Sequence, residues 1–131
     1  MTEHPASVMD EELLARFILQ SSWIREDKTV RQDAFIPPPD LELSVTRHSD
    51  LTAIQMWNIG RHVADTSARM LYGRADIQAI SIRNQKLVVE IDPTSKNPNH
   101  TIIKGWPNDK PSQKMIAINL AASSKFVSIA T

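Results

Sequence analysis

The chain contains no cysteine and only three glycines. The lack of cysteine excludes disulfides, thiolate catalysis and zinc sites built on cysteine. With so little glycine, the sequence has neither the GxGxxG pattern of dinucleotide-binding folds nor a Walker A loop for phosphate groups. These absences remove several well-marked enzyme classes, so the function has to be sought in other side chains.

The chain also lacks a surplus of either charge, because 15 lysines and arginines balance 15 aspartates and glutamates. A general nucleic-acid binder needs a basic surplus to displace the counterions of the phosphate backbone, so that function is not expected. No apolar run is long enough for a membrane-spanning helix, and the acidic N-terminus lacks the apolar segment of a signal peptide. We therefore expect a cytoplasmic protein that binds neither membranes nor nucleic acids in general.

A length of 131 residues and an apolar content of 41% fit one domain around a single hydrophobic core. We expect a flexible tail over residues 1–9 and a single α+β domain over residues 10–131. In that domain, three or four short strands should pack against about four helices, because helical and strand patterns alternate irregularly along the chain.

Two patterns dominate the first third of the chain. Apolar residues recur at helical spacing in "LLARFILQ", which predicts a helix over residues 11–20. Apolar and polar residues alternate in "LELSVTRH", which predicts a half-buried strand over residues 41–48. Arg47 falls on the apolar face of that strand, where an arginine needs a partner or an opening to solvent.

The middle of the chain favours helices. Thr52 and Gln55 form a capping box, which predicts a helix that runs to about Asp65. The segment "GRADIQAISIRNQ" (73–85) fits helical spacing better than strict alternation. It predicts a short helix that ends near Asn84, in the left-handed conformation typical of a helix C-terminus.

The last third combines strands with one helix. The final helix is expected to begin at Asn108 or Asp109, with Pro111 in its first turn. Three strands are predicted, a buried one at residues 86–92 and two others at residues 100–104 and 125–129.

The spacing of the histidines and serines predicts neither a metal site nor a catalytic motif. No two of the four histidines have the spacing of metal ligands on a helix, so we expect neither a metal site nor a cofactor. No Ser-His-Asp or paired-carboxylate constellation stands out. Ser44 or Ser49 near His48 is too weak a pattern to carry a catalytic hypothesis.

Four basic residues are the candidates for ligand binding. Arg47 ends a predicted strand, Arg74 begins a predicted helix, and His100 and Lys104 bound a third element. If they converge, arginines hold an anionic group while His100 serves as acid or base. In the alternative, Arg74 pairs with Asp76 or a nearby acid, and Arg47 pairs with Glu42 or Asp50. His100 then hydrogen-bonds backbone in its own loop.

Two tryptophans are candidates for an interface with another chain, Trp106 and Trp23. Trp106 stands between Gly105 and Pro107, and it has a second interpretation as a lid over the core. In that case its indole N–H reaches a carbonyl group.

Most of the chain, from Leu14 to Val127, resembles a family of small, uncharacterised bacterial proteins. The segments that carry the resemblance are "LARFILQSSWIR", "AFIPPPDLELSVTRHSDLT", "MLYGRADIQA" and "NPNHTIIKGWPNDKPSQKMIAINLA". No activity is attached to that family, so the resemblance implies residues to inspect and no mechanism. Relatives tend to carry glycine where this chain has Gln85-Lys86. The matching positions are Arg47, Arg74, Asp76, His100, Trp106, Pro107, Lys110 and Gln113.

Two functional hypotheses follow. The first, which we favour, is a non-enzymatic accessory or partner-binding module of a bacterial multi-protein system, joined to a protein partner or to a second copy of itself. The second is a small enzyme or ligand-binding domain that acts on a nucleotide, an RNA end or another phosphorylated molecule. This second hypothesis requires Arg47, Arg74 and His100 to surround one cleft.

Overall fold

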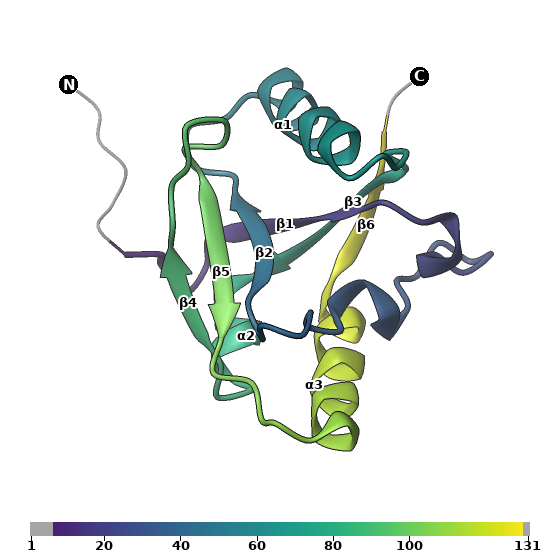
Figure 1. Cartoon of the computed structure of the whole chain (residues 1–131), viewed down its shortest axis with the longest axis vertical. Helices are drawn as coiled ribbons and strands as arrows, with labels where there is room; N and C mark the ends of the chain where they lie inside the picture. The colour runs from purple at the N-terminus through teal and green to yellow at the C-terminus, as the bar shows by residue number, and fades with distance from the viewer. Residues whose placement is uncertain (1–6, 130–131) are drawn as a thin grey trace.

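The structure is a computed structural model that describes residues 7–129, and its centre is one antiparallel sheet of six strands (Figure 1). The order across the sheet is β4-β5-β2-β1-β3-β6, so β2 and β1 lie in the middle and β4 and β6 form the edges. The strands are β1 (Leu13–Ile18), β2 (Leu43–Arg47), β3 (Gly73–Gln78), β4 (Val88–Ile91), β5 (His100–Lys104) and β6 (Lys125–Ser128).

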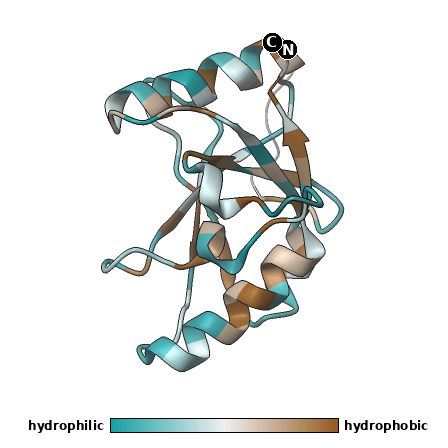
Figure 2. Cartoon of the chain, turned by 90° about the vertical axis from the view of Figure 1, so that its right-hand side faces the viewer, coloured by the Kyte–Doolittle hydropathy of each residue, from teal (hydrophilic) through white to brown (hydrophobic). Residues whose placement is uncertain are grey.

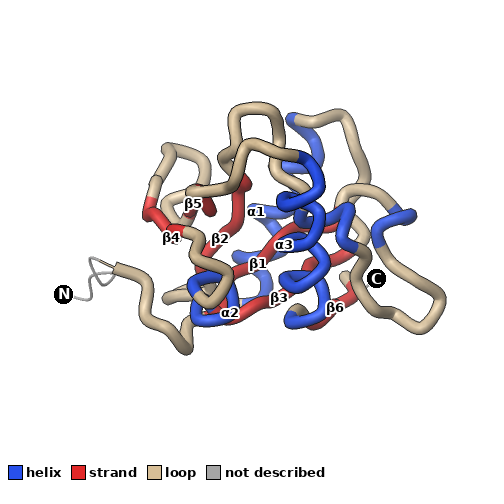
Figure 3. The backbone as a smooth tube through the Cα atoms, turned by 90° about the horizontal axis from the view of Figure 1, so that it is seen from below, coloured by secondary structure: helices blue, strands red, loops and turns tan. Residues whose placement is uncertain are grey.

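Helices cover both faces of the sheet. Figure 2 shows α1, which is mostly hydrophilic, on one side and α3, which carries hydrophobic bands, on the other. Figure 3 shows α2 together with α3 in front of the strands. We call the two faces the α1 side and the α3 side. The helices are α1 (Ala53–Thr66), α2 (Ala79–Arg83) and α3 (Lys110–Ser123), with two 3-10 helices, η1 (Ser21–Trp23) and η2 (Gln32–Phe35).

Strand alternation divides the buried residues into two unequal clusters. Leu14 and Ile18 of β1 belong to the main cluster, which lies on the α3 side and includes Leu120 of α3. Ala15 and Phe17, which alternate with Leu14, Arg16 and Ile18, point to the α1 side and belong to a small cluster under α1. Because successive strand residues face opposite sides, one strand supplies both clusters.

The predicted helix over residues 11–20 is wrong, because this segment is the central strand β1. Helices cover both faces of β1, so its apolar residues are consecutive where a half-buried strand would alternate. A short consecutive apolar run also matches helical spacing, and periodicity alone does not separate the two.

The predicted helix over residues 73–85 is wrong in its first half, which forms strand β3. The parity of the apolar residues changes at Ala79 because the strand period gives way to the helix period of α2 there. The helix ends at Asn84 as predicted, but Asn84 is right-handed, and the left-handed residue is Lys86 with φ 63°.

Several predicted elements are confirmed. The strand predicted over residues 41–48 is β2, and α1 begins with the predicted capping box. The Thr52 hydroxyl accepts from the Gln55 N–H at 3.1 Å, and the Gln55 side chain accepts from the Thr52 N–H at 2.8 Å. Asp109 caps α3 by accepting from the Ser112 N–H at 2.9 Å. Strands β5 and β6 also lie where the sequence predicts them.

The α+β class is confirmed, but the sheet has six strands where three or four were expected. The difference arises because the patterns of β1 and β3 predict helices. The strand predicted as buried over residues 86–92 is the edge strand β4, in which Val88 is exposed.

The packed domain begins before residue 10, because Val8 is buried in the main cluster. Of the tail predicted over residues 1–9, residues 1–6 lie outside the described residues. Within residues 7–129, no helix combines the length and the apolar character needed to cross a bilayer.

Candidate functional site

A row of positions crosses the α1 side of the sheet and carries polar clusters at its two ends. The register places His100 of β5 opposite Thr46 of β2, Thr46 opposite Ala15 of β1, and Ala15 opposite Asp76 of β3. Neighbouring strands lie about 4.8 Å apart, so about 14 Å separates His100 from Asp76. The two ends therefore hold separate clusters.

The first cluster joins Ser44, His100 and Asp92 by hydrogen bonds. His100 Nδ1 lies 2.9 Å from the backbone carbonyl oxygen of Asp92 and 3.1 Å from Asp92 Oδ2. His100 Nε2 lies 3.0 Å from Ser44 Oγ. A carbonyl oxygen only accepts hydrogen bonds, so Nδ1 carries the ring proton. In the neutral imidazole Nε2 is then an acceptor, and the Ser44 hydroxyl donates to it.

Two buried asparagines fix the turn that leads into this cluster. Asn97 donates to a threonine hydroxyl on β2 at 2.9 Å and accepts from the Asn99 N–H at 3.1 Å. Asn99 donates from Nδ2 to the carbonyl oxygens of Arg47, at 2.9 Å, and Ser49, at 2.7 Å. These bonds tie the turn to the end of β2 and set the position of the first residue of β5.

The pairing between β1 and β2 stops beside Ser44. Its last pair on that side is Ala15 with Thr46, and the side chain of Arg16 enters the space that follows. Arg16 donates from Nη1 to the carbonyl oxygen of Ser44 at 3.2 Å and from Nε to that of Ala34 at 2.8 Å. Burial of the guanidinium lowers the pKa of Arg16 to about 10, so the group is still positively charged at neutral pH.

A small cavity of about 40 Å³ lies at this break in the sheet. Ser44, His100 and Arg16 line it together with apolar side chains, among them those of Phe17 and Val63. The cavity thus brings a hydroxyl and an imidazole beside an apolar wall, with Arg16 at the break in the sheet.

The second cluster lies under α1 and contains Arg74, Asp76 and His48. Arg74 Nε donates to both carboxylate oxygens of Asp76, at 3.0 and 3.2 Å, and His48 Nε2 lies 2.8 Å from Asp76 Oδ1. The guanidinium of Arg74 also lies 4.6 Å from the ring centroid of Trp57, a cation–π contact with α1. The cluster therefore helps to hold α1 on the sheet, and the predicted pair of Arg74 with Asp76 is confirmed.

The structure does not bring Arg47, Arg74 and His100 into one pocket. The side chain of Arg47 is 2% exposed and lies on the α3 side, where it donates to both carboxylate oxygens of Glu12, at 2.7 and 2.8 Å. Arg74 and His100 lie on the α1 side, in the two clusters described above. The cleft required by the phosphorylated-ligand hypothesis is therefore not formed by these three residues.

Lys104, the fourth predicted ligand-binding residue, pairs with Glu90 of the neighbouring edge strand at 2.7 Å. The hydrogen bond from Lys104 to Glu90 raises the pKa of the Lys104 ammonium above its ordinary value. Within residues 7–129, no three histidine, aspartate or glutamate side chains are grouped so that they could hold a metal ion.

The two tryptophans proposed for an interface differ in exposure. Trp106 is 6% exposed, and its indole N–H donates to the carbonyl oxygen of Ile103 at 3.0 Å, as expected for a lid over the core. That burial leaves little of the ring exposed to a partner. Trp23 is half-buried and lies 5.6 Å from the guanidinium of Arg16.

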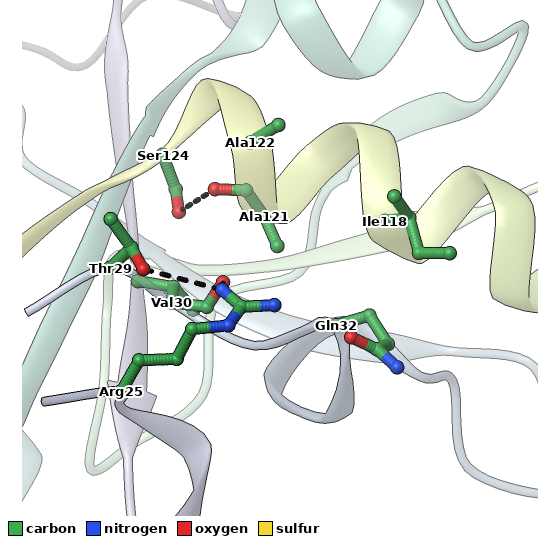
Figure 4. Close-up of a pocket in the computed structure, with 8 residues that line it drawn as sticks. All are labelled: Arg25, Thr29, Val30, Gln32, Ile118, Ala121, Ala122 and Ser124. Atoms are coloured by element: carbon green, nitrogen blue, oxygen red, sulfur yellow. Dashed lines mark hydrogen bonds between the residues drawn. The ribbon is translucent and has the colours of Figure 1, made fainter. Parts of the chain in front are cut away.

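A groove runs between α3 and the loop that precedes η2 (Figure 4). Arg25 of this loop donates to the Thr29 hydroxyl at 3.3 Å and to the carbonyl oxygen of Val30 at 3.0 Å, which shapes one wall. The groove has a volume of about 300 Å³ and is lined by Arg25, Thr29, Val30, Gln32, Ile118, Ala121, Ala122 and Ser124.

The outer face of α3 continues this groove as an apolar stripe. Met115 is 60% exposed and Ile118 39% exposed, and Ala122 follows one turn later. Their spacing of three and four residues places them on one face of the helix. The charged residues of α3 are Lys110 and Lys114, and the helix contains no acidic residue. We call Met115, Ile118 and Ala122 the α3 stripe.

Sequence patterns missed the Ser44–His100–Asp92 cluster because its members come from separate parts of the chain. Ser44 and His100 are 56 residues apart, and Asp92 and His100 are 8 apart. No local spacing marks such a set, and only the register of β2 against β5 brings the serine and the histidine together.

No protein-family model, curated protein or solved structure matches the chain. The resemblance to a family of uncharacterised bacterial proteins stays a prediction, and the function has to be argued from the sites themselves.

Proposed function

We propose that this chain is a partner-binding accessory module of a bacterial multi-protein system, and that its partner docks on the α3 stripe. The supporting observation is an exposed apolar helix face that continues into a groove of about 300 Å³. Single exposed apolar residues are ordinary, whereas a contiguous apolar surface beside a groove is typical of a docking site. Removal of apolar surface from water favours association.

The charges around the α3 stripe favour one kind of partner. Lys110 and Lys114 lie on the helix itself, and Arg25 lines the groove. A second copy of this chain would bring like charges together across the interface, which opposes self-association. The occupant that fits best is an amphipathic helix of another protein, with acidic residues on either side of its apolar face.

A site-specific cross-linking experiment tests this proposal. A photoreactive amino acid replaces Ile118 in one variant and Ile54 in a control, and each is irradiated in the native host. Ile54 is 73% exposed on α1, so it matches the apolar character of the site without the groove. We expect one protein to be captured at position 118 and not at position 54, through an acidic amphipathic segment.

The Kd of the purified partner then tests whether the partner binds at the α3 stripe. Ile118→Asp should raise the Kd at least about tenfold, which corresponds to about 1.4 kcal/mol, because it places a carboxylate in the apolar contact. Ile54→Asp should leave the Kd unchanged. Equal capture at both positions, or a Kd that Ile118→Asp does not change, would overturn the proposal.

A further inference from the structure

We propose that Ser44 is a catalytic nucleophile that hydrolyses esters of small acyl groups, with His100 as its general base. This activity goes beyond partner binding and uses the opposite side of the sheet. It would make the chain an enzyme in its own right, in contrast to the non-enzymatic module favoured from the sequence.

The direction of the hydrogen bonds supports this role for Ser44. Asp92 accepts the Nδ1 proton of His100 through its backbone carbonyl at 2.9 Å and its carboxylate at 3.1 Å, which leaves Nε2 free to accept. Nε2 lies 3.0 Å from Ser44 Oγ, within the range expected for a nucleophile and its base. Asp92 acts here as a positioning residue that fixes the tautomer of His100.

The break in the sheet places a backbone donor where an oxyanion would form. In an antiparallel pair, the N–H and C=O of one residue point to the same neighbouring strand. The Ser44 carbonyl points to the β1 side, where it accepts from Arg16, so the Ser44 N–H points there as well. The β1–β2 register ends at Ala15 and Thr46, so the N–H of Ser44 faces the cavity beyond that pair.

Arg16 lines the same cavity, but it belongs to the face of β1 that carries Leu14 and Ile18. Its guanidinium is held by the carbonyls of Ser44 and Ala34. Donors and charges that are already in place where negative charge develops stabilise a transition state without reorganisation. The Ser44 N–H supplies this donor, and the Arg16 guanidinium adds its positive charge from the α3 side, where the Ser44 and Ala34 carbonyls hold it.

The size of the cavity limits the acyl group. A volume of about 40 Å³ holds roughly three water-sized groups, taking about 10–15 Å³ for each. An acetyl group, with two carbons and a carbonyl oxygen, has that size. Phe17 and Val63 offer an apolar wall to its methyl group. The alcohol portion would lie outside, because Ser44 is on the exposed part of the strand.

The reaction has two balanced steps. Ser44 Oγ attacks the carbonyl carbon of the acetyl ester while His100 Nε2 takes the hydroxyl proton. The bond to the alcohol oxygen then breaks, and this oxygen takes the proton back from His100, which leaves acetyl-Ser44. A water molecule, activated by His100, attacks the acetyl carbonyl, and acetate and free Ser44 are released.

Hydrolysis of p-nitrophenyl acetate by the whole chain, with peptide mapping of the acetylated protein, tests the inference. We expect saturable hydrolysis and acetylation at Ser44. Ser44→Ala and His100→Gln should each lower kcat/KM at least about 100-fold. Asp92→Asn should lower kcat only about tenfold, because its backbone carbonyl still holds Nδ1. p-Nitrophenyl butyrate should react at least about tenfold more slowly than the acetate.

Two matched variants, Ser123→Ala and His62→Ala, control for unspecific reaction, because both residues are exposed outside the site. Their rates should equal that of the wild type. Peptide mapping of the wild type does not depend on the folding of any variant. Acetylation on lysines instead of Ser44, or a rate for folded Ser44→Ala within about threefold of wild type, would overturn the inference.

Discussion

The two sides of the sheet use polar residues differently. On the α3 side, the polar side chain of Arg47 is enclosed and paired with Glu12, next to the main apolar cluster. On the α1 side, three buried apolar residues form a much smaller cluster, and polar groups such as Ser44 and His100 keep contact with solvent. The α3 side therefore contains the larger buried cluster that stabilises the fold. On the α1 side, polar side chains such as Ser44 remain accessible to solvent.

The largest expected effect is on the α3 side, at Glu12. Glu12→Gln removes the charge that faces an almost fully buried guanidinium, and loss of one partner of such a pair costs about 3 kcal/mol of unfolding free energy. Urea unfolding measures the change. Glu11→Gln, at an exposed neighbouring residue, is the control and should change stability by less than about 0.5 kcal/mol. Equal effects at both positions would mean that the pair is not desolvated.

The next largest effect concerns the turn that leads into β5. Asn99→Ala deletes two hydrogen bonds to the carbonyls of Arg47 and Ser49, and it should cost about 2 kcal/mol of unfolding free energy. The same variant should weaken ester hydrolysis, because the turn positions His100. Asn108→Ala, on the exposed turn before α3, should do neither. Unchanged stability would show that the turn is not held by Asn99.

A smaller effect on stability tests how closely α1 packs against the sheet. A Cβ added at Gly60 would lie 2.7 Å from Phe17 Cε1, so Gly60→Ala forces the ring to move. Overpacking costs about 1–3 kcal/mol and the higher helix propensity of alanine returns about 1 kcal/mol, which leaves a net loss of about 1 kcal/mol. Asn58→Ala on the exposed face of α1 should not destabilise. A thermal unfolding experiment in which Gly60→Ala gains stability would contradict the close contact.

The smallest expected effect is at Arg74. Arg74→Lys keeps the charge next to Asp76 but loses the planar contact with Trp57, so it should cost less than about 1 kcal/mol. Arg69→Lys, at an exposed residue after α1, is the control. A loss of unfolding free energy as large as that of Glu12→Gln would contradict the expected difference in stability between the two sides of the sheet.

Much of the fold could be predicted where one local signal decides the structure. The capping box of Thr52 and Gln55 and the Asp109 cap are set by residues three positions apart, and both are found in the structure. The failures at β1 and β3 have a different origin. Helices on both faces bury consecutive residues of β1, and a strand passes directly into a helix at Ala79, so neither segment keeps the alternation of a half-buried strand.

The sites were harder to predict than the fold. The sequence singles out His100 and predicts, as one alternative, its bond to backbone in its own loop, but its partner Ser44 depends on strand register. The strand pattern predicts that Arg47 needs a partner, yet Glu12 is 35 residues away in a segment predicted as helix. Long-range pairs of this kind leave no spacing in the sequence.

The tautomer of His100 decides whether Ser44 on the α1 side can act as a nucleophile. Long-range ¹H–¹⁵N NMR spectra of the neutral imidazole distinguish a proton on Nδ1 from a proton on Nε2. We expect the proton on Nδ1, held by Asp92, with Nε2 accepting from Ser44. A proton on Nε2 would point the hydrogen bond toward Ser44 and would contradict the role of this serine as a nucleophile.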